Sequence, residues 1–195
     1  MTTDKASSKK KSFLREALDL ARFVLIVLAI VVPIRIFIAQ PFIVNGESMV
    51  PTFANGDYLI VDEISYRFNE PERGEVIVFR NPTKNKQFLI KRIIGLPGET
   101  IAINGDKVTV TKNDTTIQLD EDYINGNFSS YGTWELGAEE YFAMGDNRGK
   151  SLDSRSWGNL PKDLIVGKTF LRLFPLATID FHPGVQEAAE IETII

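Results

Sequence analysis

An apolar segment near the start of the chain constrains its fold most. Residues 23–34 read Phe-Val-Leu-Ile-Val-Leu-Ala-Ile-Val-Val-Pro-Ile without a charge, and residues 35–39 continue as Arg-Ile-Phe-Ile-Ala. Taken from residue 20 to residue 39, the segment has about 20 residues, which is the length of a helix that crosses a bilayer. Arg22 and Arg35 lie near its ends, where long cationic side chains reach the headgroups. We expect an uncleaved transmembrane helix over residues 20–39.

Two other structures are weighed for the same segment. A buried core helix would show a polar stripe, and this segment has none. A cleaved signal peptide would end at an Ala-x-Ala-like site. The candidate, Ile38-Ala39-Gln40-Pro41, fits poorly because Pro41 directly follows Gln40 and large residues surround it.

The charge distribution predicts the orientation of this helix. Residues 1–22 hold six basic and three acidic residues, a net charge of +3, and the remaining residues hold 16 basic and 23 acidic, a net charge of −7. By the positive-inside rule, residues 1–19 form a cytoplasmic N-terminus and everything after residue 40 lies outside the cell membrane. Met1 to Lys11 is polar and Ser/Lys-rich, so we expect it to be disordered. The acidic body argues against nucleic acid as a partner.

Composition also restricts the chemistry. There is no cysteine, so disulfides and thiolate metal sites are excluded, and His182 is the single histidine. A histidine-built zinc site is therefore disfavoured. We expect neither a metal nor a cofactor.

After Pro41 the sequence predicts a mainly β fold, a β-barrel or β-sandwich. Short apolar runs alternate with turn signals such as Asn55-Gly56, Pro97-Gly98 and Asn104-Gly105, and no strong amphipathic helix is visible. Residues 105–137 are more polar and turn-rich, so we expect a cap or small β-ribbon inserted between core residues 40–104 and 138–182, with a flexible tail at 183–195. The predicted strands are 58–61, 75–79, 88–90, 93–94, 100–103, 108–110, 141–144 and 165–174.

The first candidate for chemistry is Ser48, in Val44 to Phe53 (Val-Asn-Gly-Glu-Ser-Met-Val-Pro-Thr-Phe). Gly46 permits a turn that a side chain would forbid, and Pro51 stiffens the exit. Such a loop presents a hydroxyl outward. Alone, the pattern is more often an ordinary turn.

The second candidate is Lys91, in Phe-Leu-Ile-Lys-Arg-Ile-Ile at 88–94. Strand alternation puts Lys91 on one face and Arg92 on the other, so a cation is buried among aliphatic side chains unless both heads reach water. An edge strand with snorkelling cations is the simpler interpretation. The functional one is that burial lowers the lysine pKa and yields a general base for a Ser–Lys dyad. A Ser-His-Asp scheme competes, but His182 is expected to be a surface turn residue.

A third segment, Gly145 to Gly158, reads Gly-Asp-Asn-Arg-Gly-Lys-Ser-Leu-Asp-Ser-Arg-Ser-Trp-Gly. It does not fit a phosphate loop, because the first glycine is misplaced and no helix pattern follows. Instead we expect a turn in which Asp146, Arg148, Asp153 and Arg155 neutralise one another and hold Ser151.

Together these segments resemble the signature motifs of bacterial type I signal peptidases. The motifs are Gly46-Glu-Ser-Met-Val-Pro-Thr52, Lys91-Arg-Ile-Ile-Gly-Leu-Pro-Gly-Glu99 and the 145–158 segment, with 57–62 and 74–80 between them. With a single span and a short insertion, the chain resembles the Gram-positive forms more than the two-span forms. The resemblance implies a membrane-bound serine endopeptidase with a Ser–Lys dyad that cleaves signal peptides from exported preproteins after an Ala-x-Ala-like site.

The resemblance also implies residue roles. Ser48 matches the nucleophile, Lys91 the general base, and Ser151 the serine that orients the lysine amine. Asp153 and Arg155 match the supporting pair, and we group Asp146 and Arg92 with them. Some family members carry an oxyanion-binding serine where this chain has Gly46, so the oxyanion hole relies on the Ser48 N–H and a second group. Candidate substrate-binding residues are Phe42, Val44, Met49, Phe53 and Ile90.

The implied partners are signal peptides, membrane lipid and the secretion translocon. Two other functions are considered. Self-cleaving Ser–Lys repressors share the dyad but carry a DNA-binding region where this chain has an apolar segment. A non-catalytic, membrane-anchored assembly factor of pilus or secretion machinery would be expected to lose the nucleophile or base, and both are present.

Overall fold

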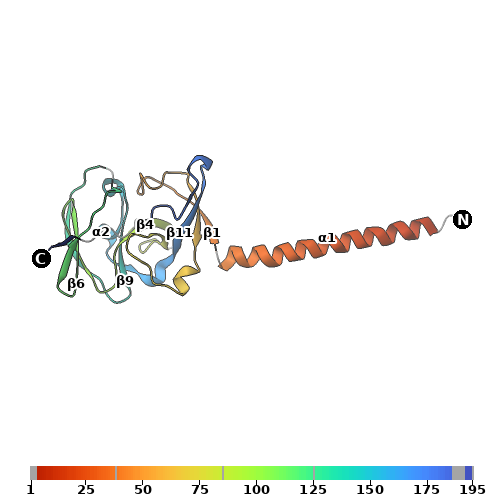
Figure 1. Cartoon of the computed structure of the whole chain (residues 1–195), viewed down its shortest axis with the longest axis horizontal. Coiled ribbons are helices and arrows are strands. Elements are labelled where there is room, and N and C mark those ends of the chain that lie inside the picture. The colour runs from red at the N-terminus through yellow and green to blue at the C-terminus, as the bar shows by residue number, and fades with distance from the viewer. Residues whose placement is uncertain (1–3, 38, 85, 125, 186–191, 195) are drawn as a thin grey trace. The chain divides into compact units, whose positions relative to one another are not determined.

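The computed structural model describes residues 4–37, 39–84, 86–124, 126–185 and 192–194. The chain divides into two units, residues 1–39 and residues 40–195. The first contains one helix, α1 (Asp4–Phe37), drawn in red to orange in Figure 1. Residues 4–11 were expected to be disordered and are instead helical, as their alanine and lysines allow. No helix among the described residues has the length and apolar character that crossing a membrane requires. The transmembrane helix over 20–39 stays a prediction.

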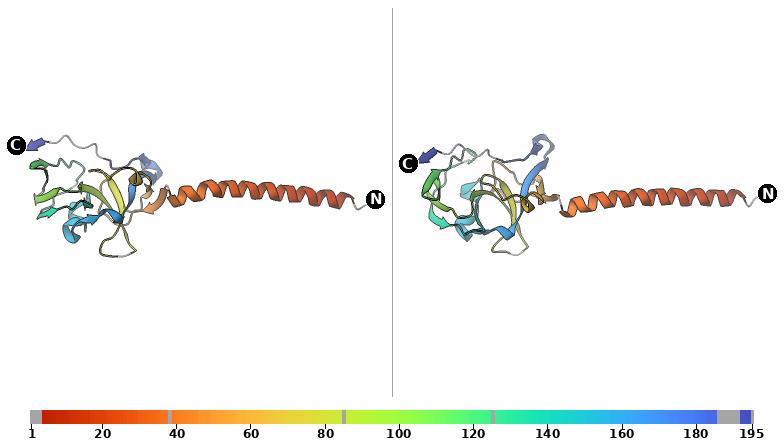
Figure 2. Two further views of the ribbon diagram at one scale, coloured as in Figure 1. Left: turned by 90° about the horizontal axis from the view of Figure 1, so that it is seen from below. Right: turned by 60° about the horizontal axis from the view of Figure 1, so that its bottom comes forward.

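The second unit confirms the expected mainly β fold. Its larger sheet has eight strands in the order β1-β2-β11-β3-β4-β9-β10, with β12 paired to β11, and the sheet curls rather than lying flat (Figure 2). Every pairing described between these strands is antiparallel. The strands are β1 (Ala39–Ile43), β2 (Tyr58–Asp62), β3 (Val76–Arg80), β4 (Phe88–Gly95), β9 (Glu140–Met144), β10 (Leu160–Pro161), β11 (Ile165–Phe174) and β12 (Asp180–Phe181).

A smaller sheet of five strands has the order β13-β7-β6-β5-β8. Figure 1 shows β6 at the opposite end of this unit from β1, with β4 and β9 between them. The strands are β5 (Thr100–Gly105), β6 (Lys107–Lys112), β7 (Thr115–Gln118), β8 (Ser130–Glu135) and β13 (Glu192–Ile194). Part of the expected flexible tail, residues 192–194, is thus a strand paired with β7. Residues 186–191 and 195 of that tail lie outside the described residues.

Short helices connect the strands. They are η1 (Ser65–Arg67), η2 (Arg148–Lys150), α2 (Ser154–Trp157), η3 (Lys162–Leu164) and η4 (Leu176–Thr178). The α2 helix begins where the sequence showed no helix pattern. It has an Asp153 N-cap whose side chain accepts from Arg155 N, which satisfies one free N–H of its first turn.

Three buried apolar clusters hold the second unit together. One joins β4 and β9 to the smaller sheet through residues such as Ile94, Ile101 and Phe142. A second lies among β3, β4, β9 and β10. The third consists of Val44, Met49, Phe53, Leu59 and Val76. Because Met49 follows Ser48 directly, this cluster anchors the Ser48 loop to the core. Strand β4 contributes to all three, since its alternate residues face opposite sides.

Candidate active site

Ser48 lies on a tight loop between β1 and β2. Gly46 has φ of +98°, a conformation that side chains disfavour, and its N–H donates to Asn55 Oδ1 at 2.9 Å. Below the loop, Met49 and Phe53 are 1% and 0% exposed. The loop is therefore fixed by a buried anchor while Ser48 itself stays partly accessible.

Lys91 reaches Ser48 from β4. Its Nζ lies 2.7 Å from Ser48 Oγ, as donor in a hydrogen bond, and donates also to Ile90 O at 2.8 Å. The lysine is 3% exposed. The structure thus brings together the two residues that the sequence singled out 43 positions apart.

The surroundings of Lys91 favour the neutral amine. Burial lowers the pKa of Lys91 to about 8, with Asp153 and Asp146 opposing the shift and Arg155 adding to it. No carboxylate among the described residues forms an ion pair with Lys91. About a tenth of the amine is therefore unprotonated at pH 7 and about half at pH 8, and the unprotonated form is the one that a general base requires.

Gly145 is the point at which the 145–158 loop meets Ser48. Its N–H donates to Asp153 Oδ2 at 3.1 Å, and its carbonyl accepts from Arg148 Nε at 3.1 Å. A Cβ at Gly145 would lie 2.2 Å from Ser151 Oγ and 2.4 Å from Ser48 O. The close approach of this loop to Ser48 therefore requires glycine.

Asp153 and Arg155 form the expected pair. Arg155 Nε and Nη2 donate to the two carboxylate oxygens of Asp153, each at 2.8 Å, and Nη2 also donates to Arg148 O at 2.8 Å. Ser151 Oγ is buried beside Gly145 and has no hydrogen-bond partner among the described residues. The structure therefore brings Ser151 to the site without a hydrogen bond to Lys91.

Asp146 and Arg148 do not neutralise each other, contrary to the expectation from sequence. Asp146 accepts from Arg92 Nε at 2.9 Å and from Arg92 Nη2 at 2.6 Å, and both residues are fully buried. Arg148 instead pairs with Glu121, through Nη1 at 2.9 Å and through Nη2. Against the opposing effect of burial, Glu121 raises the pKa of Arg148. The expectation failed because it considered only charges within the 145–158 segment. The actual partners, Arg92 and Glu121, come from other segments of the chain.

A groove of about 340 Å³ runs from the dyad between β1 and β4. Phe42 of β1 and Phe88 of β4 both line it and contact each other edge to face, with centroids 5.3 Å apart. Of the five predicted substrate-binding residues, Phe42, Val44 and Ile90 line this groove. Met49 and Phe53 do not line it, and both are buried, at 1% and 0% exposed. Groove residues that were not predicted include Asn45, Leu59, Val78, Lys86, Gln87 and Leu89.

β4 is not paired with another strand on the groove side of Ile90. β9 pairs only with residues from Arg92 to Gly95. Ile93 exchanges its backbone bonds with the β3 side, through Gly74 and Glu75, so by alternation the N–H and C=O of Ile90 point away from β3. The Ile90 carbonyl accepts from Lys91 Nζ, so the N–H is the group of Ile90 left open to another extended segment.

Two further observations concern alternative chemistry. His182 is exposed, with φ of +54°, and packs edge to face on Phe170 at a centroid distance of 5.2 Å. This agrees with a surface turn residue. Within the described residues, no group of three or more His, Asp or Glu side chains is arranged to hold a metal ion.

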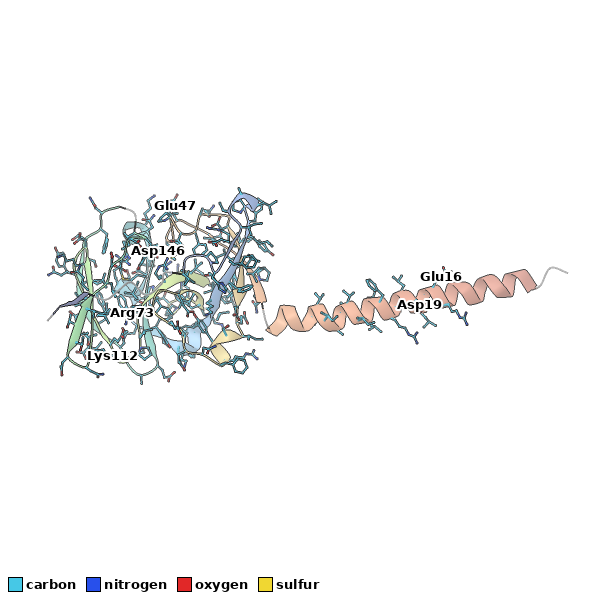
Figure 3. All side chains as sticks on the ribbon, viewed as in Figure 1. Glu16, Asp19, Glu47, Arg73, Lys112 and Asp146 are labelled. Atoms are coloured by element: carbon cyan, nitrogen blue, oxygen red, sulfur yellow. The ribbon has the colours of Figure 1, made fainter. Side chains whose placement is uncertain are left out.

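Sequence reasoning missed two contacts of this site. Asn147 donates through its N–H to Ser48 O at 3.0 Å, and Glu121 supplies the carboxylate for Arg148. Asn147 belongs to the Gly145-Asp146-Asn147 turn signal, so a role for it in this turn could have been predicted from the sequence. Glu121 lies in a polar stretch that gives no sign of its partner. Figure 3 labels Asp146 inside the unit and Glu47 at its rim.

Comparison with known proteins covers all these segments. The family described as signal peptidase, peptidase S26, matches residues 17–174. A signal peptidase I of Leptolyngbya laminosa is 40% identical over 152 residues, which cover 73% of this chain and 72% of that protein. A probable signal peptidase I-2 of Synechocystis sp. is 37% identical, with coverage of 95% and 88%. A signal peptidase I P of Bacillus subtilis subsp. natto is 34% identical, with coverage of 90% and 97%. A solved signal peptidase I from Enterococcus faecalis V583 aligns with 51% of this chain and 97% of its own, at 30% identity and a TM-score of 0.45.

Proposed function

The chain belongs to the signal peptidase S26 family, and on this premise we propose that it is a membrane-anchored serine endopeptidase that cleaves preproteins through a Ser48–Lys91 dyad. The family supports removal of signal peptides from preproteins. The observation that carries the dyad is the 2.7 Å contact between Lys91 Nζ and Ser48 Oγ, at a lysine whose pKa burial lowers to about 8.

The proposed reaction is acyl transfer in two steps. Neutral Lys91 takes the Ser48 proton, Oγ bonds to the scissile carbonyl carbon, and the ammonium then protonates the leaving amine as the peptide bond breaks. In the second step water gives a proton to Lys91 and bonds to the acyl carbon, the bond from that carbon to Ser48 Oγ breaks, and the Lys91 ammonium returns the proton to Oγ. Asp153 and Arg155 are proposed to hold the loop that carries Ser151, and Arg92 and Asp146 to hold the strand behind Lys91.

The substrate is proposed to add as a strand between β1 and β4. The Ile90 N–H, which points away from β3 on the groove side, supports main-chain recognition of this kind. Large apolar side chains such as Phe42, Leu59 and Val78 line the groove. Such a lining suits small apolar side chains, which supports cleavage after an Ala-x-Ala-like site.

Membrane anchoring through residues 20–39 is part of the proposal. The support is the uncharged run at 23–34 and the exposure of its side chains, among them Leu25 at 65% and Ile30 at 57%. An anchor with the N-terminus in the cytoplasm would hold the catalytic unit at the outer face of the cell membrane. The apolar segments of signal peptides are retained in that membrane. The effective concentration of signal peptides at the active site would therefore be higher than for an enzyme free in solution. Membrane lipid and the secretion translocon are the proposed partners there.

The test is cleavage of a preprotein by the purified full-length chain in detergent micelles. We expect a shortened product with a new N-terminus after the small-residue site, and no product from Ser48→Ala. Fractionation of cells that make the chain is expected to place it in the membrane after alkaline extraction. Cleavage by Ser48→Ala would contradict the nucleophile, and recovery in the soluble fraction would contradict the anchor.

A further inference from the structure

Asn147 holds the peptide groups on both sides of the Ser48 Cα. Its backbone N–H donates to Ser48 O at 3.0 Å. Its side-chain Nδ2 donates to Glu47 O, also at 3.0 Å. One residue of the 145–158 loop therefore fixes the orientation of the two peptide planes that flank the proposed nucleophile.

The contact with Glu47 O also sets the direction of a donor. In a trans peptide the C=O and the following N–H point in opposite directions, so fixing Glu47 O fixes the Ser48 N–H. Val50 N–H donates to the same oxygen at 3.2 Å, from within the turn. No group in the described ranges accepts from the Ser48 N–H. It is held in one direction and left available to a ligand.

Asn147 itself rests on a rigid base. Its neighbours Asp146 and Arg148 are 0% and 3% exposed, and each is held by an ion pair to another segment, with Arg92 and Glu121 respectively. The carbonyl of Asn147 accepts from Lys150 N at 3.0 Å. A side chain positioned from such a base can impose a direction on the exposed Ser48 loop.

We propose that Asn147 is a positioning residue that aims the Ser48 N–H at the oxyanion formed during acyl transfer. The inference rests on the proposed function and adds the residue that orients its oxyanion donor. Gly46 carries no hydroxyl, so a side chain at that position cannot serve as an oxyanion donor beside the Ser48 N–H. Stabilisation of the oxyanion depends on donors preorganised toward the developing charge. The direction of the Ser48 N–H therefore matters more here than in a site where a serine hydroxyl donates as well.

The experiment compares Asn147→Ala with wild type and with Lys150→Ala. Lys150 is a matched control, because it ties the same loop to Glu47 through an exposed ion pair at 2.6 Å and does not contact the peptide group. The measurements are kcat and KM on a signal-peptide substrate, the pH profile, and the affinity for a peptide aldehyde. The aldehyde forms a hemiacetal with Ser48, and its oxygen occupies the oxyanion position.

For Asn147→Ala we expect kcat to fall roughly 10- to 100-fold, somewhat less than loss of a whole oxyanion donor. The KM should stay within about twofold, aldehyde affinity should fall in proportion to kcat/KM, and the pH midpoint should not move. Lys150→Ala should match wild type within about twofold. If Asn147→Ala does not fold, Asn147→Leu, which is similar in size and has neither a side-chain donor nor a charge, replaces it.

Three results separate the claims. An Asn147 variant with wild-type kcat and aldehyde affinity overturns this inference and leaves the dyad intact. A loss of kcat accompanied by a shifted pH midpoint and unchanged aldehyde affinity also overturns it, because that pattern points to Lys91. Processing by Ser48→Ala overturns the proposed function itself.

Discussion

Lys91 and Arg92 are adjacent, both buried, and opposite in their pairing. Arg92 is 0% exposed and binds Asp146 through two nitrogens. Lys91 is 3% exposed and contacts the Ser48 hydroxyl and the Ile90 carbonyl. Alternation along β4 separates them, so that one cation remains charged in a structural ion pair while the other can lose its proton. The dyad depends on this division.

The first prediction concerns pH. Because burial lowers the pKa of Lys91 to about 8, the fraction of neutral base rises with pH through that value. Cleavage rate should climb from acid pH and level off above it. Initial rates on a fluorogenic signal-peptide substrate measure the profile. A rate that is flat from about pH 5 to 9 would argue against a titrating lysine base.

The second prediction is that Lys91→Met stabilises the fold. A lysine with a folded pKa near 8 and an unfolded pKa near 10.5 costs about 3 kcal/mol when protonated. The native state releases this proton first, so the cost is full below pH 8 and disappears as pH rises to 10.5. Denaturant unfolding at pH 7 should show the variant more stable by roughly 1–3 kcal/mol. An advantage that does not shrink between pH 8 and 10.5 would count against the assigned cause.

The third prediction compares two glycines of one loop. A Cβ at Gly145 would come within 2.4 Å of Ser48 O, whereas a Cβ at Gly149 meets nothing within 4 Å. Gly145→Ala should displace the Ser48 loop and lower kcat/KM by about two orders of magnitude, as small misplacements of reacting groups do. Gly149→Ala should stay near wild type. Equal activity of the two variants would show that the close approach is not required.

The fourth prediction contrasts a buried with an exposed ion pair. Asp146→Asn leaves Arg92 without its carboxylate and should destabilise the fold by about 3–5 kcal/mol. Glu47→Gln breaks the exposed pair with Lys150 and should cost less than about 1 kcal/mol. Urea denaturation of both variants gives the comparison. A small effect of Asp146→Asn would mean that Arg92 finds another partner.

The sequence predicted strands best where apolar residues alternate. The runs at 58–61, 75–79 and 165–174 correspond to β2, β3 and β11, and the two runs at 88–90 and 93–94 both lie in β4. β8 was missed, because Ser130 and Gly132 suggest a turn, yet its residues 130–135 pair with β5. Pairing across the sheet overrides local propensity there.

The site was predictable in its parts and less so in its contacts. Alternation indicated that one of Lys91 and Arg92 would be buried. Both are, because β9 pairs with β4 at Arg92 and the Ser48 loop lies against Lys91. The partners Asp146 and Glu121 were beyond sequence reasoning, since each depends on a long-range contact. Met49 and Phe53 look like pocket residues in a linear reading, but the turn at Gly46 directs them into the core.

The most direct test of the dyad is preprotein cleavage by purified Lys91→Met at pH 9, with Ser48→Ala and wild type beside it. Methionine keeps the length of the side chain and removes the base, and unfolding curves establish that the variant is folded. We expect wild type to cleave the preprotein and neither Lys91→Met nor Ser48→Ala to do so. Cleavage by folded Lys91→Met at a rate near that of wild type would contradict it.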